Sequence, residues 1–215
     1  MEEKKKLIGY YNYTVILTYT GMITGLLGIT FVMDGSFYGA ATALMISGLC
    51  DMFDGTIAST KERSESEKHF GIQIDSLSDL ICFGVLPGFF LYRACGETSM
   101  SLLISCFYIL CALVRLAYFN VAETERQSVE TGRRKNYQGL PVTSAAMILP
   151  ALFIIDHIAA ADLAAIFKVV MCLTAVAFLL RIRIRKPGRA GKVIIMFIGV
   201  AEFVILLISG TGVIL

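Results

Sequence analysis

The sequence lacks the clusters of histidine and cysteine from which zinc and iron sites are commonly built. Its two histidines, His69 and His157, stand apart in expected loops, and we predict only surface roles for them. Its six cysteines are scattered singly with no C-x-x-C pair. That distribution is typical of small apolar packing residues. It argues against both a zinc-binding domain and a disulfide framework.

Charged residues are also scarce. They make up 17% of the 215 residues, whereas hydrophobic residues make up 56%, and the mean hydropathy is +0.73. This composition is too apolar for an ordinary soluble domain. Several stretches approach the roughly 20 apolar residues that a membrane-spanning helix needs. We therefore predict an all-α integral membrane protein with about seven spans, near residues 12–33, 36–59, 72–94, 98–121, 140–158, 160–182 and 191–213.

Lysine and arginine lie almost entirely on one side of this predicted topology. They concentrate in the N-terminus, in the loops after the second and fourth spans, and in the segment RIRIRKPGRAGK after the sixth. Because basic loops favour the cytoplasmic side, we predict a protein of a bacterial- or archaeal-type cytoplasmic membrane with these loops inside. Such a face attracts anionic membrane lipids. A nucleic-acid partner is not expected, since no soluble module remains to present the basic residues.

Four aspartates stand where a carboxylate is costly. Asp51 and Asp54 close the second predicted span, and Asp75 and Asp79 open the third. Each pair is three or four residues apart, so its members share one helix face. Both pairs should lie at a similar depth on the cytoplasmic side, and their mutual repulsion requires an offsetting cation. All-oxygen clusters suit Mg²⁺, Mn²⁺ or Ca²⁺, and a two-metal site typically clamps a phosphoryl group.

The motif Asp51-x-x-Asp54-Gly55-x-x-Ala58, followed by Gly71-x-x-x-Asp75-x-x-x-Asp79, resembles the signature of the CDP-alcohol phosphatidyltransferase family. The resemblance implies a core of six transmembrane helices, usually dimeric, that holds two divalent cations, Mg²⁺ or Mn²⁺. It implies that Asp51, Asp54, Asp75 and Asp79 are metal ligands and that Asp79 is also the catalytic base. It further implies a nucleotide site formed by Asp51, Gly55, Ala58, Ser59, Gly71 and Asp75.

The chain departs from the family pattern at two points. Ser59 stands where the family has an arginine near the nucleotide phosphates, and the spacer from Ser59 to Gly71 is longer than is typical. Lys61, Arg63 or Lys68 within that spacer could supply the missing positive charge.

Three further motifs resemble the phosphatidylserine synthase branch of the family: DSLSDLICFGVLP at 75–87, RLAYFNV at 115–121 and YQGLPVTSAA at 137–146. Arg115 lies inside a span, and its guanidinium suits a phosphate or the carboxylate of serine, although it could instead extend to the headgroups. The predicted substrate- and phosphate-binding residues are Arg115, Asn120, Lys61, Arg63, Lys68, Arg133, Arg134 and Lys135.

The resemblance thus implies transfer of a phosphatidyl group from CDP-diacylglycerol to L-serine, with phosphatidylserine and CMP as products. Another alcohol acceptor, glycerol phosphate or inositol phosphate, remains an alternative within the family, as does a catalytically weakened relative because of Ser59. A cation-coupled transporter is the alternative from another class, although such a protein typically has charges near the midplane and broken helices.

We divide the chain into a CDP-alcohol phosphatidyltransferase membrane domain, residues 1–182, and a basic loop with an additional transmembrane helix, residues 183–215. Lys168 and Glu202 lie at similar depths in the last two predicted spans. If these spans form an antiparallel hairpin, the two residues should form a buried ion pair that docks the additional helix.

Overall fold

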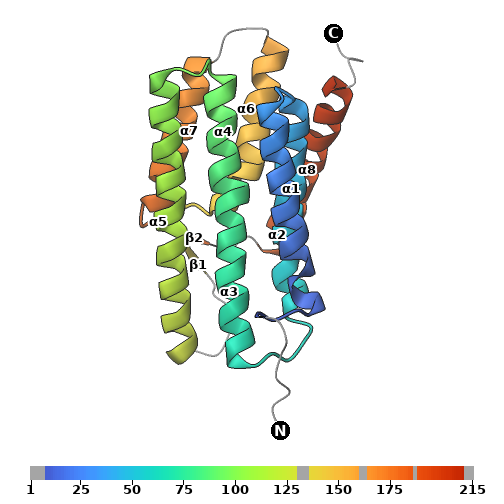
Figure 1. Cartoon of the computed structure of the whole chain (residues 1–215), viewed down its shortest axis with the longest axis vertical. Helices are drawn as coiled ribbons and strands as arrows, with labels where there is room; N and C mark the ends of the chain where they lie inside the picture. The colour runs from blue at the N-terminus through green and yellow to red at the C-terminus, as the bar shows by residue number, and fades with distance from the viewer. Residues whose placement is uncertain (1–7, 130–135, 160–163, 186–187, 211–215) are drawn as a thin grey trace.

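The computed structural model describes residues 8–129, 136–159, 164–185 and 188–210. Its helices run side by side along the long axis of the molecule (Figure 1). The first elements are η1 (Tyr13–Val15), α1 (Ile16–Met33), α2 (Phe37–Ala58), α3 (Glu65–Asp79), the π-helical segment η2 (Leu80–Val85), α4 (Leu86–Ala94) and α5 (Ser99–Val129). They are followed by β1 (Asn136–Gln138), η3 (Val142–Ser144), α6 (Ala145–Ala159), α7 (Ala164–Leu179), β2 (Arg183–Arg185) and α8 (Arg189–Gly210).

The predicted all-α architecture is confirmed. The segments α3, η2 and α4 follow one another without a break, so the helices of the described residues form seven rods at the positions of the seven predicted spans. The largest differences are at the ends of two rods. The helix α3 begins at Glu65 and α5 continues to Val129, so both extend beyond the predicted spans at the end of the molecule where the N-terminus lies (Figure 1).

Within the part of the chain that the structure describes, three helical segments are long and apolar enough to cross a membrane: Tyr13–Met33, Glu65–Ala94 and Ser99–Glu125. Three shorter apolar helices cover Val142–Ile155, Ala164–Leu179 and Val193–Ser209. Many large apolar side chains face outward from these helices, as Phe197 does on α8 with 68% exposure. An exposed apolar surface of this extent is typical of contact with lipid.

Glycines allow α1 to pack closely against the third rod. A Cβ atom at Gly25 would lie 2.5 Å from Cys82 Sγ, and one at Gly28 would lie 2.7 Å from a methyl carbon of Leu86. The same helix is joined to α2 by Ser47, whose Oγ donates a hydrogen bond to Gly21 O at 2.9 Å. The helix α1 therefore brings α2 and the third rod together, which is where the two aspartate pairs lie.

Two short strands pair the segment before α6 with the segment after α7. The strands β1 and β2 are antiparallel, with Tyr137 opposite Ile184. Immediately after β1, Gly139 has φ +77°, and a Cβ atom there would lie 2.8 Å from Phe178 O. Its amide donates to Ile182 O at 2.8 Å. Only glycine fits this position without strain.

The predicted ion pair between Lys168 and Glu202 is wrong. The helix α8 packs against α2 and α6, whereas α7 packs against α5, so the last two helices are not a hairpin. Figure 1 shows them on opposite sides of the bundle. No salt bridge joins Lys168 to Glu202, both of which are described, and Glu202 Oε2 is buried with no hydrogen-bond partner in the described structure. The chain crosses the bundle through β2 before α8 begins, which separates the two side chains.

Candidate active site

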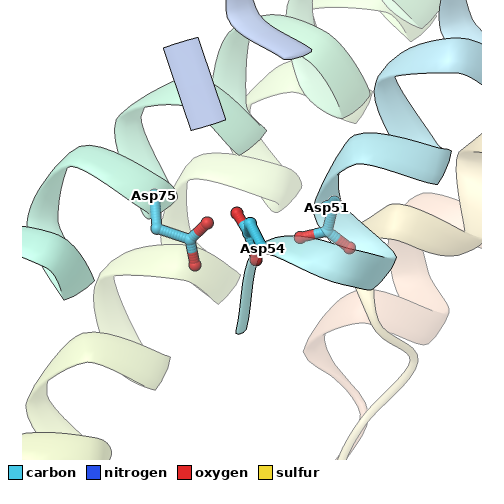
Figure 2. Close-up of side chains that lie close together, drawn as sticks. All are labelled: Asp51, Asp54 and Asp75. Carbon is cyan, nitrogen blue, oxygen red and sulfur yellow. The ribbon is translucent and has the colours of Figure 1, made fainter. Parts of the chain in front are cut away.

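Three of the four aspartates converge on one point between α2 and α3. Asp51 and Asp54 come from the last turns of α2, and Asp75 comes from α3. Each offers a carboxylate oxygen, and these three atoms all lie within 4.8 Å of one another. Figure 2 shows the three carboxylates pointing toward one another from the two helices. The sequence spacing predicted a cluster of four aspartates, and the structure brings three of them together.

Buried polar groups on α1 support the cluster. Asp54 is only 9% exposed, and its Oδ2 accepts a hydrogen bond of 3.1 Å from the buried Thr18 Oγ1. Below it, Ser78 Oγ donates to Thr18 O at 3.3 Å, and Cys82 Sγ donates to Gly21 O at 3.3 Å. These contacts fix the helix backbones around the carboxylates. Thr18 carried no recognisable sequence signal, because its role depends on how α1 is placed.

Asp79 lies close to the cluster but is not part of it. It is one helical turn beyond Asp75, and it lines a small inner cavity together with Asp51, Asp54 and Asp75. Immediately after Asp79 the helix widens into the π-helical segment η2. Such π-bulges are frequent at functional sites. The arrangement separates one carboxylate from the other three.

The donor set fits a hard divalent cation. All candidate ligand atoms in the cluster are carboxylate oxygens, which suit Mg²⁺, Mn²⁺ or Ca²⁺ rather than zinc. Three carboxylates this close repel one another strongly in a partly buried setting, and a bound cation offsets that repulsion. The side chains present therefore match the cation requirement that the sequence predicted.

A cleft with a volume of about 230 Å³ opens beside the cluster. Asp54 and Asp75 form part of its wall. The other lining residues are Thr14, Val15, Thr18, Gly55, Ala58, Arg63, Lys68, Gly71 and Ile72. An added Cβ atom at Gly55 would meet no atom within 4 Å, so a side chain there would project into open space. The structure thus brings Gly55, Ala58 and Gly71, three residues of the motif, together around one cleft.

The three basic residues of the spacer occupy different positions. Arg63 and Lys68 line the cleft, whereas Lys61 does not. Lys61 Nζ lies 3.6 Å from Glu67 Oε1, and Lys68 Nζ lies 2.7 Å from Glu65 Oε1.

Ser59 lies outside the cleft. It is exposed at the end of α2, and its Oγ donates a hydrogen bond to Thr56 O at 2.7 Å. Its hydroxyl group is thus directed back onto its own helix.

Glu67 holds one wall of the cleft in place. Its Oε2 accepts from the amide of Ser64 at 2.9 Å, while its own amide donates to Ser64 Oγ at 3.2 Å. This capping box begins α3. Glu67 Oε1 also accepts from Asn12 Nδ2 at 3.2 Å, which ties the N-terminal segment to α3. The S-x-x-E pattern at 64–67 was a signal in the sequence that pointed to this helix start.

The other predicted substrate-binding residues lie outside the cleft lining. Arg115 is buried, and its guanidinium carbon lies 5.5 Å from the centre of the Phe119 ring. Asn120 Oδ1 accepts from Ser76 Oγ at 2.6 Å, and its Nδ2 donates to Gln73 Oε1 at 3.2 Å, which joins α5 to α3.

Other predicted residues cannot be placed at the site. Arg133, Arg134 and Lys135 lie outside the described residues, as does the side chain of His157. His69 is exposed on α3. The substrate contacts of Arg115, Asn120 and the three basic residues at 133–135 remain predictions.

The fold and this site together define a helical membrane protein with a cluster of three carboxylates, suited to a divalent cation, beside a cleft. The chain belongs to the CDP-alcohol phosphatidyltransferase family, whose model matches residues 11–214.

Several relatives share part of the chain. An archaetidylserine synthase from Methanothermobacter thermautotrophicus is 31% identical over 155 residues, which cover 72% of this chain and 63% of that protein. A CDP-diacylglycerol–serine O-phosphatidyltransferase from Saccharomyces cerevisiae is 32% identical over 142 residues, or 63% of this chain and 50% of that protein. One with the same name from Bacillus subtilis is 28% identical over 139 residues, or 64% and 72% of the two chains. The chain therefore matches only half to about three fifths of the first two relatives' lengths.

Proposed function

We propose that this chain transfers the phosphatidyl group of CDP-diacylglycerol to the hydroxyl group of L-serine, giving phosphatidylserine and CMP. The observation that carries the proposal is the convergence of Asp51, Asp54 and Asp75 beside a cleft bounded by Gly55 and Gly71. Family membership supports the class of reaction. The names of the relatives, which specify serine, support the choice of acceptor.

In the proposed reaction Asp79 accepts the proton of the serine hydroxyl group. The serine oxygen then forms a bond to the phosphorus that carries diacylglycerol, and the bond from that phosphorus to the CMP oxygen breaks. Asp79 suits the role of base because it lines the same inner cavity as the three clustered aspartates without belonging to the cluster. A base must lie within hydrogen-bond reach of the proton that it removes.

We propose that Asp51, Asp54 and Asp75, with Asp79 as a further ligand, hold two divalent cations, Mg²⁺ or Mn²⁺. Cations bound there would neutralise the charge that develops on the transferring phosphoryl group and on the leaving CMP. The nucleotide would lie along Gly55 and Ala58, where no protein atom within 4 Å of an added Gly55 Cβ blocks its approach.

The site lies toward the end of the bundle where η1 lies and where α2 is joined to α3, and we propose that this end faces the cytoplasm. The positive charge of the N-terminus and of the loop at 59–68 supports that orientation. CMP and serine would then reach the aspartates from water, while the acyl chains remain among membrane lipids. A homodimer and the division of the chain after residue 182 remain part of the proposal.

The test is CMP release from CDP-diacylglycerol by the purified protein in detergent, with L-serine, glycerol 3-phosphate or inositol phosphate added in turn. We expect cation-dependent release with serine only. Release with one of the phosphorylated alcohols instead would keep the chemistry and replace the acceptor. If protein that still unfolds cooperatively releases no CMP with any acceptor, the proposal is contradicted. Ser59→Arg would then be the first variant to test.

A further inference from the structure

Arg63 lines the cleft and forms no ion pair among the described residues, a combination that neither Lys61 nor Lys68 shows. The cleft is lined by two cationic side chains, Arg63 and Lys68, and by the acidic residues Asp54 and Asp75. A ligand that fits such a wall has negative charge near the cations and a bound metal near the carboxylates. A diphosphate coordinated to divalent cations has both properties.

Ion pairs distinguish the three candidates. Lys61 pairs with Glu67 outside the cleft, and Lys68 pairs with Glu65 at 2.7 Å. Among the residues that the structure describes, Arg63 takes part in no ion pair. Among the described residues, its positive charge is therefore not offset by a carboxylate partner, as the charges of Lys61 and Lys68 are.

The local structure also fixes where Arg63 lies. It directly precedes Ser64, the residue that caps α3 through the reciprocal hydrogen bonds with Glu67. Its Nη1 atom lies 3.1 Å from the position that a Cβ atom would occupy at Gly71. Because Gly71 has no side chain, the half-buried guanidinium of Arg63 can lie against the α3 backbone at the edge of the cleft.

We propose that Arg63 binds the diphosphate of the CDP-linked substrate and supplies the charge that Ser59 cannot. The inference rests on the proposed function, since it assumes a cytidine diphosphate substrate. Its guanidinium group can donate two parallel hydrogen bonds to phosphate oxygens, which a lysine cannot do. Arg63 follows Ser59 by four residues in the spacer between α2 and α3, and it lines the cleft that Ser59 does not.

The test measures binding rather than turnover. Full-length protein in detergent with Mg²⁺ is titrated with CDP and, separately, with cytidine, for the wild type, Arg63→Lys and Arg63→Gln. We expect Arg63→Gln to weaken CDP binding by about tenfold to a hundredfold, the loss of a charged hydrogen-bond pair, and to leave cytidine binding unchanged. The affinity of Arg63→Lys for CDP should lie between those of the wild type and Arg63→Gln.

Arg181→Gln is the matched control, because Arg181 is an exposed arginine whose guanidinium carbon lies 5.9 Å from the centre of the Tyr118 ring, outside the cleft lining. It should bind CDP as the wild type does. The comparison of CDP with cytidine in one protein sample separates loss of a phosphate contact from partial unfolding, which would weaken both. Equal losses for CDP and cytidine, or wild-type CDP affinity in Arg63→Gln, would overturn the inference.

Two outcomes separate the inference from the proposed function. If the wild type binds CDP through Arg63 but forms no phosphatidylserine, the function is wrong and the inference stands. If Arg63→Gln makes phosphatidylserine with a wild-type KM for CDP-diacylglycerol and a raised KM for serine, the function stands and Arg63 binds the serine carboxylate instead. Failure of the wild type to bind CDP would overturn both.

Discussion

Thr18 Oγ1 donates a hydrogen bond to Asp54 Oδ2 across 3.1 Å, and both side chains are buried. This contact joins α1 to the acidic cluster at the end of α2. It orients a buried carboxylate of the cluster. The geometry of the cluster therefore depends on a helix that carries none of the acidic residues.

Replacing Thr18 with valine removes this hydrogen bond while preserving the side-chain shape. We expect kcat for CMP release to fall about tenfold, since a hydrogen bond to a charged group contributes roughly 1.5–3 kcal/mol. The concentration of Mg²⁺ or Mn²⁺ needed for half-maximal rate should rise. Thr18→Ser keeps the hydroxyl group and should recover most of the activity. Wild-type activity in Thr18→Val together with a loss in Thr18→Ser would show that the methyl group, not the hydrogen bond, matters at this position.

Replacing Asp79 and replacing Asp54 should have different effects on transfer to serine and on CDP binding. Asp79→Asn is expected to lose transfer to serine but to weaken cation-dependent binding of CDP less than Asp54→Asn does, because Asp79 lies outside the three-carboxylate cluster. Asp54→Asn should lose both, because it removes a ligand oxygen from the cluster. The comparison uses titration with CDP alongside the rate of CMP release. If Asp79→Asn loses CDP binding to the same extent as Asp54→Asn, the main role of Asp79 is that of a metal ligand.

Replacement of a glycine by leucine should have opposite effects on stability and on substrate binding at one position in α1 and one in α2. Gly55→Leu places its side chain in open space, so we expect stability within about 1 kcal/mol of wild type but a strongly raised KM for CDP-diacylglycerol. At Gly25 a Cβ atom would lie 2.5 Å from Cys82 Sγ. Gly25→Leu should therefore destabilise the protein by about 3 kcal/mol or more through overpacking. Thermal unfolding in detergent and substrate titration together distinguish a blocked cleft from a disrupted bundle.

Gly139 and Gly35 form a second pair for comparison. Both have positive φ, +77° and +75°, but only Gly139 is enclosed, with carbonyl oxygens of Phe178 and Leu180 2.8 and 2.9 Å from an added Cβ atom. Gly139→Ala should cost about 2–5 kcal/mol, from backbone strain and the clash together. Gly35→Ala should cost about 1–2 kcal/mol, from the backbone alone. Similar melting temperatures for the two variants would contradict the close approach at Gly139.

The sequence predicted the helices and the acidic cluster because both depend on local spacing. Asp51 and Asp54 share a helix face because they are three residues apart, and runs of apolar residues indicate where the helices lie. The pairing of Lys168 with Glu202 failed because depth along a helix does not determine which helices are neighbours. The sequence alone also did not decide which of Lys61, Arg63 and Lys68 supplies the positive charge. That choice depends on the loop conformation that the Ser64–Glu67 capping box imposes.

The central claim is tested most directly by following serine and CMP in one reaction. Purified protein in detergent is given CDP-diacylglycerol, radiolabelled L-serine and Mg²⁺ or Mn²⁺, with Asp79→Asn in parallel. The account predicts that label enters the lipid fraction and CMP appears in equal amount, that chelation of the cation stops both, and that Asp79→Asn forms neither. Label that stays in the aqueous phase while CMP accumulates would contradict transfer to serine.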